Sequence, residues 1–144
     1  MRALLLPLLL ISAPSVAQLA GGELPTIQLN AGMYLIRAEV AADEPTRERG
    51  LMFRKQMASN AGMLFLFDDA ASQCMWMKNT LIPLSVAFLD DHGTIINIED
   101  MAPQTEDTHC ARRPARYALE MNGGWFAARG IKPGMRLGGI PGTK

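Results

Sequence analysis

The sequence lacks most of the features that would point directly to a function. Its 14 Lys and Arg residues balance 14 Asp and Glu residues, so the net charge gives no electrostatic reason to expect nucleic acid or an anionic membrane as a partner. It contains no glycine-rich phosphate loop, zinc-hydrolase helix motif or serine-elbow motif. No apolar run reaches the roughly 20 residues that a membrane-spanning helix needs. The sequence therefore predicts neither a nucleic-acid-binding protein nor a membrane-spanning one.

Aromatic residues are scarce, at 6% of the chain, and ten Met residues are available to fill a core in their place. Hydrophobic residues nevertheless make up 49% of the 144 residues, which is enough for one domain with a core and argues against disorder. The 13 Gly and 9 Pro residues favour many turns between short elements. This composition is typical of a mainly β or α+β domain rather than a helix bundle.

The N-terminal residues have the pattern of a secretory signal peptide. Arg2 precedes an apolar run over residues 3–11, and Ala17 ends a small-x-small cleavage site. No Cys lies near this site, so a lipid anchor is not expected. We expect an exported protein, periplasmic or extracellular. Its predicted parts are a signal peptide over residues 1–17, a flexible lead-in over 18–25 and one domain over 26–144.

The chain has only two cysteines, Cys74 and Cys110. In an oxidising compartment, two such residues are most simply explained by one disulfide. Closing a loop of this length stabilises a fold by roughly 4 kcal/mol in the chain-entropy model. The alternative is a reactive or metal-binding thiol, which the sequence leaves open.

Alternation of apolar and polar residues predicts most of the strands. Between residues 33 and 40, Arg37 and Glu39 point to one face and the apolar side chains to the other. Two apolar runs around the turn at 90–93 predict a hairpin over residues 85–98. Other strands are expected over residues 26–29, 63–67, 115–121 and 131–137. The predicted fold is a mainly antiparallel β-sandwich or partly closed barrel.

Two short helices complete this prediction. Asp43 is suited to cap a helix that fades between Met52 and Arg54. A second helix is expected over residues 125–129, where Gly130 would end it.

Several motifs resemble a known family. They are Arg49-Gly50-Leu51-Met52-Phe53-Arg54, Gly62-Met63-Leu64-Phe65 and Trp76-Met77-Lys78-Asn79-Thr80-Leu81-Ile82-Pro83-Leu84, with later matches over 114–117, 119–124 and 130–134. Over roughly residues 29–137 the chain resembles the bacterial and archaeal domain of unknown function 192. The resemblance implies a jelly-roll-like sandwich and an often exported protein. It implies no activity, cofactor or catalytic residue. Met135 departs from the family pattern, which tends to an acidic residue there.

The stretch after Cys74 is the strongest candidate for a binding site. Trp76, Lys78, Asn79 and Thr80 lie where a strand breaks into a turn, and Arg49 and Arg54 could flank them. An aromatic platform with amide, hydroxyl and cationic donors suits a carbohydrate or a carboxylate-like ligand. A structural role explains the same residues equally directly, because amide and hydroxyl side chains also satisfy turn backbone.

A soft-metal site is a second interpretation. Met75 and Met77 share one face of an extended segment, and thioethers suit Cu(I), particularly with Cys74, His92 or His109 close by. The simpler interpretation is that both Met residues fill the core. We therefore predict no cofactor.

A hydrolase-like enzyme is a third interpretation. Glu39 and Glu120 are expected on outward faces, where they could pair as two carboxylates, and His109 adjoins Cys110. No third catalytic member is evident. We favour a non-enzymatic structural or small-ligand-binding module, with a small molecule or a protein as its unidentified partner. An exposed apolar patch expected around Trp125 and Phe126 is an alternative protein interface.

Overall fold

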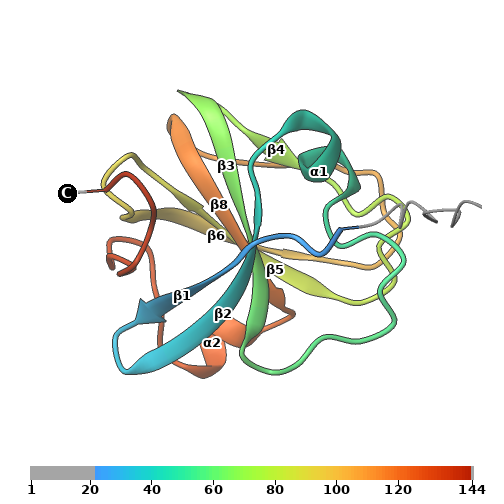
Figure 1. Ribbon diagram of the computed structural model, residues 1–144, viewed down its shortest axis with the longest axis horizontal. Helices are drawn as coiled ribbons and strands as arrows, with labels where there is room; N and C mark the ends of the chain where they lie inside the picture. The colour runs from blue at the N-terminus through green and yellow to red at the C-terminus, as the bar shows by residue number, and fades with distance from the viewer. Residues whose placement is uncertain (1–21, 144) are drawn as a thin grey trace, which may run out of the picture.

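The computed structural model describes residues 22–143, which form a six-stranded sheet, a two-stranded sheet and two short helices (Figure 1). The predicted signal peptide and residues 18–21 of the predicted lead-in lie outside the described residues. The large sheet has the strand order β1-β2-β3-β8-β5-β6. Its strands are β1 (Thr26–Ala31), β2 (Tyr34–Ala41), β3 (Ala61–Ala71), β5 (Leu84–Leu89), β6 (Ile95–Met101) and β8 (Ala115–Asn122).

The predicted mainly β fold with two short helices is confirmed. One strand pair differs from the expected antiparallel arrangement: β2 and β3 are parallel, with Arg37 opposite Ala61. The chain between them passes through α1 (Glu44–Arg49) and a long loop, which returns β3 to run beside β2 in the same direction. Asp43 caps α1 as predicted, but α1 ends at Arg49, earlier than expected, and Gly50 follows it with a positive φ of 45°.

Both faces of the sheet are covered by apolar side chains. The Trp125 core includes Leu29, Ile36, Leu64, Leu119 and Trp125. The Phe65 core lies on the other face and includes Leu51, Met63, Phe65, Met77 and Val86. Strand β5 is buried at every position because it serves both cores.

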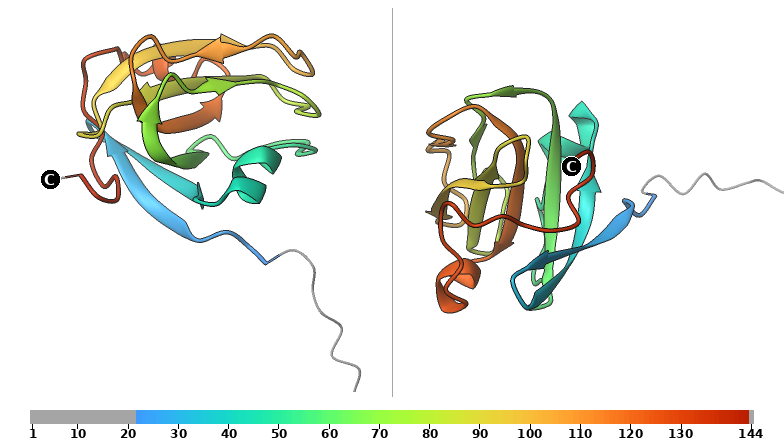
Figure 2. Two further views of the ribbon diagram at one scale, coloured as in Figure 1. Left: turned by 90° about the horizontal axis from the view of Figure 1, so that it is seen from above. Right: turned by 90° about the vertical axis from the view of Figure 1, so that its left-hand side faces the viewer.

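The C-terminal segment joins the two edges of the sheet at one end (Figure 2). Asn30 of β1 exchanges backbone hydrogen bonds with Gly138, at 3.0 and 2.8 Å. At the other edge, the N–H of Ile95 in β6 donates to the carbonyl of Met135 at 2.9 Å. The last short strand expected within residues 131–137 is reduced to one isolated bridge, between Arg136 and Thr94, and Gly138 forms a second bridge with Asn30. Since β1 and β6 do not pair directly within the described part of the chain, the sheet is not a closed barrel.

The predicted apolar surface patch at Trp125 and Phe126 is wrong. Both side chains belong to α2 (Trp125–Ala128), and they are only 3% and 1% exposed. They point into the Trp125 core, and the guanidinium of Arg129 lies 4.4 Å from the Trp125 ring. The first two residues of helix α2 therefore face the core rather than solvent.

The predicted disulfide is confirmed. Cys74 and Cys110 lie directly opposite each other in the two-stranded sheet formed by β4 (Cys74–Met75) and β7 (His109–Cys110), with an S–S distance of 2.04 Å. Neither thiol is therefore free to act as a nucleophile or a metal ligand in this structure. No helix within residues 22–143 is long and apolar enough to cross a membrane.

Candidate functional site

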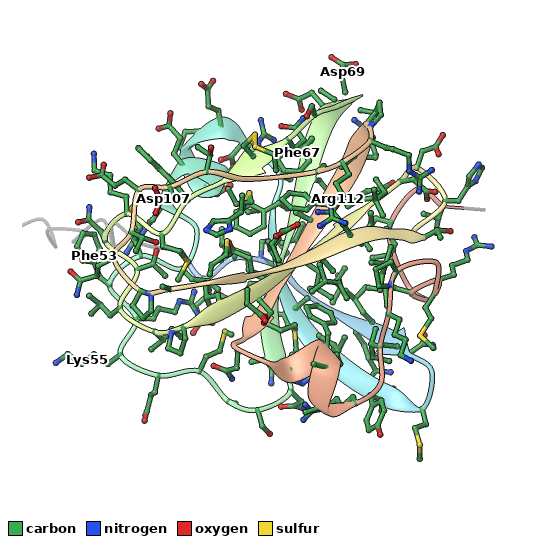
Figure 3. The ribbon with its side chains drawn as sticks, turned by 180° about the vertical axis from the view of Figure 1, so that it is seen from behind. Phe53, Lys55, Phe67, Asp69, Asp107 and Arg112 are labelled. Carbon is green, nitrogen blue, oxygen red and sulfur yellow. A yellow bond between two sulfur atoms is a disulfide. The ribbon has the colours of Figure 1, made fainter. Side chains whose placement is uncertain are left out.

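A cavity of about 560 Å³ opens beside α1, the end of β3 and the segment that follows β4. Helix α1 supplies charged side chains, β3 supplies aromatic and acidic ones, and β4 supplies Cys74 and Met75. Figure 3 shows Phe67 and Asp69 along the end of β3 that borders this cavity. We call this cavity the Glu120 pocket, after the carboxyl group that strand β8 contributes to its lining.

Glu120 is the least expected member of the site. In β8 it lies between Met63 of β3 and Val86 of β5, both completely buried, and it is itself only 3% exposed. No group within residues 22–143 donates a hydrogen bond to its carboxyl or forms an ion pair with it. Burial raises the pKa of Glu120 to about 8, because water no longer stabilises the charged form. The carboxyl is therefore mostly protonated at neutral pH.

The expectation that Glu120 faces outward is wrong, and the pairing with Glu39 that the sequence left open does not form. Both residues lie in one cross-strand row, but Met63 separates them. Glu39 instead forms an ion pair with Arg54, with an O···N distance of 2.5 Å. Because α1 and the β4–β7 sheet cover this face, a position that alternation assigns to solvent becomes buried.

The wall of the pocket is aromatic and sulfur-rich. Phe65, Phe67 and Trp76 line it together with Met52 and Met75. Trp76 is 45% exposed, so part of its ring remains accessible. A surface of this kind can hold an apolar or cationic group, whereas the Glu120 carboxyl can exchange hydrogen bonds or a proton with it.

The rim carries more negative than positive groups. Glu44 and Glu48 of α1 face it, as do Asp68 and Asp69 of β3. Two arginines also line the pocket. Arg47 is already engaged, because its guanidinium donates to the carbonyls of Ala42 and Leu66 and pairs with Asp68 at 3.3 Å. The second arginine, Arg49, lies in the last turn of α1.

The structure brings together half of the predicted ligand-binding residues. Trp76, Thr80 and Arg49 line the pocket. Lys78, Asn79 and Arg54 are not among its lining residues, although the Lys78 ammonium lies 5.2 Å from the Trp76 ring. The buried hydroxyl of Thr80 donates to the carbonyl of Lys78 at 3.1 Å, which orders the turn. Their role in ligand binding stays a prediction.

Asn79 has a clear structural task. Its φ of 52° lies in the left-handed region. Its backbone carbonyl accepts a hydrogen bond from the N–H of Phe53 at 2.8 Å. We expect Asn79→Ala to lower the free energy of unfolding by about 1 kcal/mol, because Ala adopts this conformation less readily than Asn. Asn79→Gly serves as the control and should cost less, since Gly tolerates a positive φ. Equal urea midpoints for the wild type and Asn79→Ala would contradict this role.

The two Met residues of the proposed copper site have different environments. Met77 lies completely buried in the Phe65 core, while Met75 is half-buried at the pocket. Cys74 is unavailable as a thiolate because it forms the disulfide. Neither His92 nor His109 lines the pocket, and within residues 22–143 no group of three or more His, Cys, Asp or Glu side chains could hold a metal ion. These positions favour core packing, and Cu(I) binding stays a prediction.

Sequence reasoning named Glu120 only as an outward-facing carboxylate and did not anticipate its burial. The available signal was one ionisable residue, Glu120, between apolar neighbours in a strand rich in buried residues. Met135, which departs from the family pattern, does not line the pocket. Its departure therefore does not alter the pocket lining.

Comparisons with known proteins place the chain among uncharacterised relatives. Residues 26–139 match the family DUF192, described as an uncharacterized ACR family. A Sinorhizobium meliloti 1021 structure, described as a candidate transcription regulator, shares 40% identity with a TM-score of 0.72, covering 76% of this chain and 88% of that one. A Novosphingobium aromaticivorans DSM 12444 protein of unknown function shares 33% identity with a TM-score of 0.76, covering 88% and 92%. No curated protein matches the chain.

Proposed function

The chain belongs to the DUF192 family of uncharacterised proteins, and from that premise we propose that it is a binding module for a small polar ligand that enters the Glu120 pocket. Glu120 carries this proposal, because it is a buried acidic residue in a central strand and also lines the pocket. A volume of about 560 Å³ lies within the usual range of ligand sites, roughly 300–1,000 Å³.

The energetic cost of Glu120 supports a functional role. An apolar side chain at the same position would pack against Met63 and Val86 without any desolvation penalty. Ionisable groups with strongly perturbed pKa values in a cleft are typical of functional sites. A ligand that pairs with this carboxyl would supply the partner that the protein itself does not.

The charge of the rim narrows the ligand class. The lining contains five carboxyl groups, counting Glu120, and two guanidinium groups, one of which is engaged by Asp68. A carboxylate-like ligand would meet unfavourable electrostatics there. A neutral ligand such as a saccharide, or a positively charged ligand, fits the lining better. The partly exposed ring of Trp76 can stack against either kind of ligand.

Export is part of the proposal. A disulfide between Cys74 and Cys110 is favoured in an oxidising compartment, and the N-terminal residues have the pattern of a signal peptide. We expect the protein expressed in its native host to appear in the periplasmic or extracellular fraction as a shortened chain. Mass spectrometry of that fraction would detect a new N-terminus near Gln18. A full-length cytoplasmic chain would contradict export.

The pocket is tested by titrating the protein with separate panels of neutral saccharides, amines and small carboxylates. Amide chemical shifts should move for pocket residues such as Gly50, Gln73 and Trp76. Trp76→Ala should weaken binding at least tenfold, because it removes the accessible ring. Met33→Ala is the matched control, since Met33 is an exposed apolar residue outside the pocket lining. If no compound moves these resonances, the pocket is not a small-ligand site.

A further inference from the structure

Building on the proposed function, we propose that the ligand of the Glu120 pocket is an organic cation, a protonated or quaternary amine. Its positive group would lie between the Glu120 carboxylate and the aromatic wall formed by Phe65, Phe67 and Trp76. Binding would displace the proton that Glu120 carries in the empty pocket.

The charges around Glu120 favour a cation. Helix α1 contributes Glu44 and Glu48 together with Arg47 and Arg49. Strand β3 adds Asp68 and Asp69, and the β4 segment adds no charged side chain to the lining.

Not all of these charges are equally available. The guanidinium of Arg47 is held by two backbone carbonyls and Asp68. Arg49 is then the remaining basic residue among those that line the pocket. Arg54 is paired with Glu39, two strands away from Glu120. Because the ion pair with Arg47 also engages Asp68, three other carboxyl groups of the rim remain against Arg49, and this excess favours positive ligands.

The wall offers the surfaces that hold an ammonium group. Aromatic faces attract cations through the ring quadrupole, and Trp is the strongest of them. The Trp76 ring already attracts one cation, because the Lys78 ammonium lies 5.2 Å from its centroid. Lys78 itself is not among the residues that line the pocket. The thioethers of Met52 and Met75 add polarisable contacts for the methyl or methylene groups of an alkylamine.

The proton balance follows from the burial of Glu120. In the empty pocket the carboxyl is protonated at neutral pH, because burial raises its pKa to about 8. A bound cation stabilises the carboxylate, so the complex forms as an ion pair and the O–H proton passes to solvent. Each unit of pH between about 6 and 8 should then raise the apparent affinity by up to tenfold. A neutral ligand gains no such dependence, since it leaves the carboxyl protonated.

Choline and its uncharged carbon isostere, 3,3-dimethyl-1-butanol, test this inference directly. They have nearly the same shape and differ in the positive charge. We expect choline to bind at least tenfold more tightly at pH 7.5, and to gain close to tenfold between pH 6 and 7. Calorimetry in two buffers of different ionisation enthalpy should show release of nearly one proton per choline bound.

Two variants separate the contribution of the Glu120 carboxyl to choline binding from that of the Trp76 ring. Glu120→Gln should abolish proton release and the pH dependence and weaken choline binding, whereas Glu106→Gln, an exposed loop change outside the pocket, should leave all three unchanged. Trp76→Ala, at a partly exposed position, should weaken choline binding and keep its pH dependence.

The possible failures are distinguishable. Equal affinities for choline and the isostere, or choline binding without proton release, would overturn the cation inference. A saccharide that binds the same residues independently of pH would also overturn it while leaving the proposed function intact. No binding by any compound would overturn both.

Discussion

Replacing both cysteines, as Cys74→Ala with Cys110→Ala, is expected to lower the free energy of unfolding by about 4 kcal/mol. The disulfide closes a loop with a sequence separation of 36, and this loop contains β5 and β6, the two strands at one side of the sheet. Without the cross-link the unfolded chain gains conformational freedom, whereas the cores on both faces of the sheet remain. Urea denaturation of the oxidised wild type and the double variant measures the difference.

The loss should also have a local signature. Strands β4 and β7 have only two residues each, and without the disulfide the loop from β6 to β7 loses its covalent attachment to β4. Hydrogen exchange of Met75 and His109 should accelerate in the double variant. The β5–β6 hairpin should stay protected, because β5 is buried at every position.

A reductant provides the matched control. The wild type should lose stability when dithiothreitol is added, and the double variant should not respond. In the absence of reductant, both cysteines of the folded wild type should resist alkylation, because their sulfur atoms form the disulfide. A loss of less than 1 kcal/mol would mean that the unfolded chain stays compact around this loop, contrary to the chain-entropy argument.

Local sequence patterns predicted most of the strands of the large sheet, because each pattern consists of residues that are close together in the chain. The hairpin over residues 85–98 corresponds to β5 and β6, and the apolar run over 63–67 lies within β3. The cap of α1 was also predictable, since Asp43 accepts a hydrogen bond from the N–H of Thr46 at 2.9 Å. In each case the sequence signal and the stabilising contact lie within a few residues of each other.

Contacts between distant segments were not predictable in the same way. Nothing in residues 34–71 specifies that β2 and β3 are parallel, because both directions satisfy the same alternation. The bond pair between Asn30 and Gly138 joins the two ends of the domain. The apolar patch at Trp125 failed for the same reason: its cover comes from segments remote in sequence, including Leu29 and Ile36.

The residues of the candidate site likewise differ in whether local sequence predicts their positions. Trp76 and Thr80 were predicted because a strand visibly breaks into a turn at these residues. The burial of Glu120 was not predicted, since alternation specifies two faces of a strand but not which face is covered. Helix α1 and the β4 segment convert the expected solvent face at Glu120 into the lining of a pocket. A buried ionisable residue in a central strand is thus a tertiary property.

Glu120 is expected to make the folded protein less stable as the pH rises from about 4.5 to 8. Its pKa is near 4.5 in the unfolded chain and is raised to about 8 by burial in the folded one. Between these values the folded state keeps a proton that the unfolded state has lost. The free energy of unfolding should therefore fall by about 1.4 kcal/mol per pH unit, on the order of 5 kcal/mol across the window.

The other shifted carboxyl acts outside this window. Hydrogen bonds from the backbone and side chain of Thr46 lower the pKa of Asp43 below its usual 3.8. The stability that Asp43 contributes is present above that value and is lost only as the pH falls through its lower folded pKa. A decline above pH 4.5 thus belongs to Glu120 rather than to the cap of α1.

Glu120→Gln isolates the contribution of this carboxyl to the pH dependence of the free energy of unfolding. Its amide has nearly the same shape as the protonated carboxyl and does not titrate, so the variant should match the wild type near pH 5 and exceed its stability by several kcal/mol near pH 8. Urea denaturation at pH 5, 6.5 and 8 measures this crossing, and Glu106→Gln should follow the wild type throughout. Parallel curves for Glu120→Gln and the wild type would show that water reaches the carboxyl freely. Crossing curves would instead show that the empty pocket keeps a neutral acid at its floor, at a cost in stability that an ion-pairing ligand would offset.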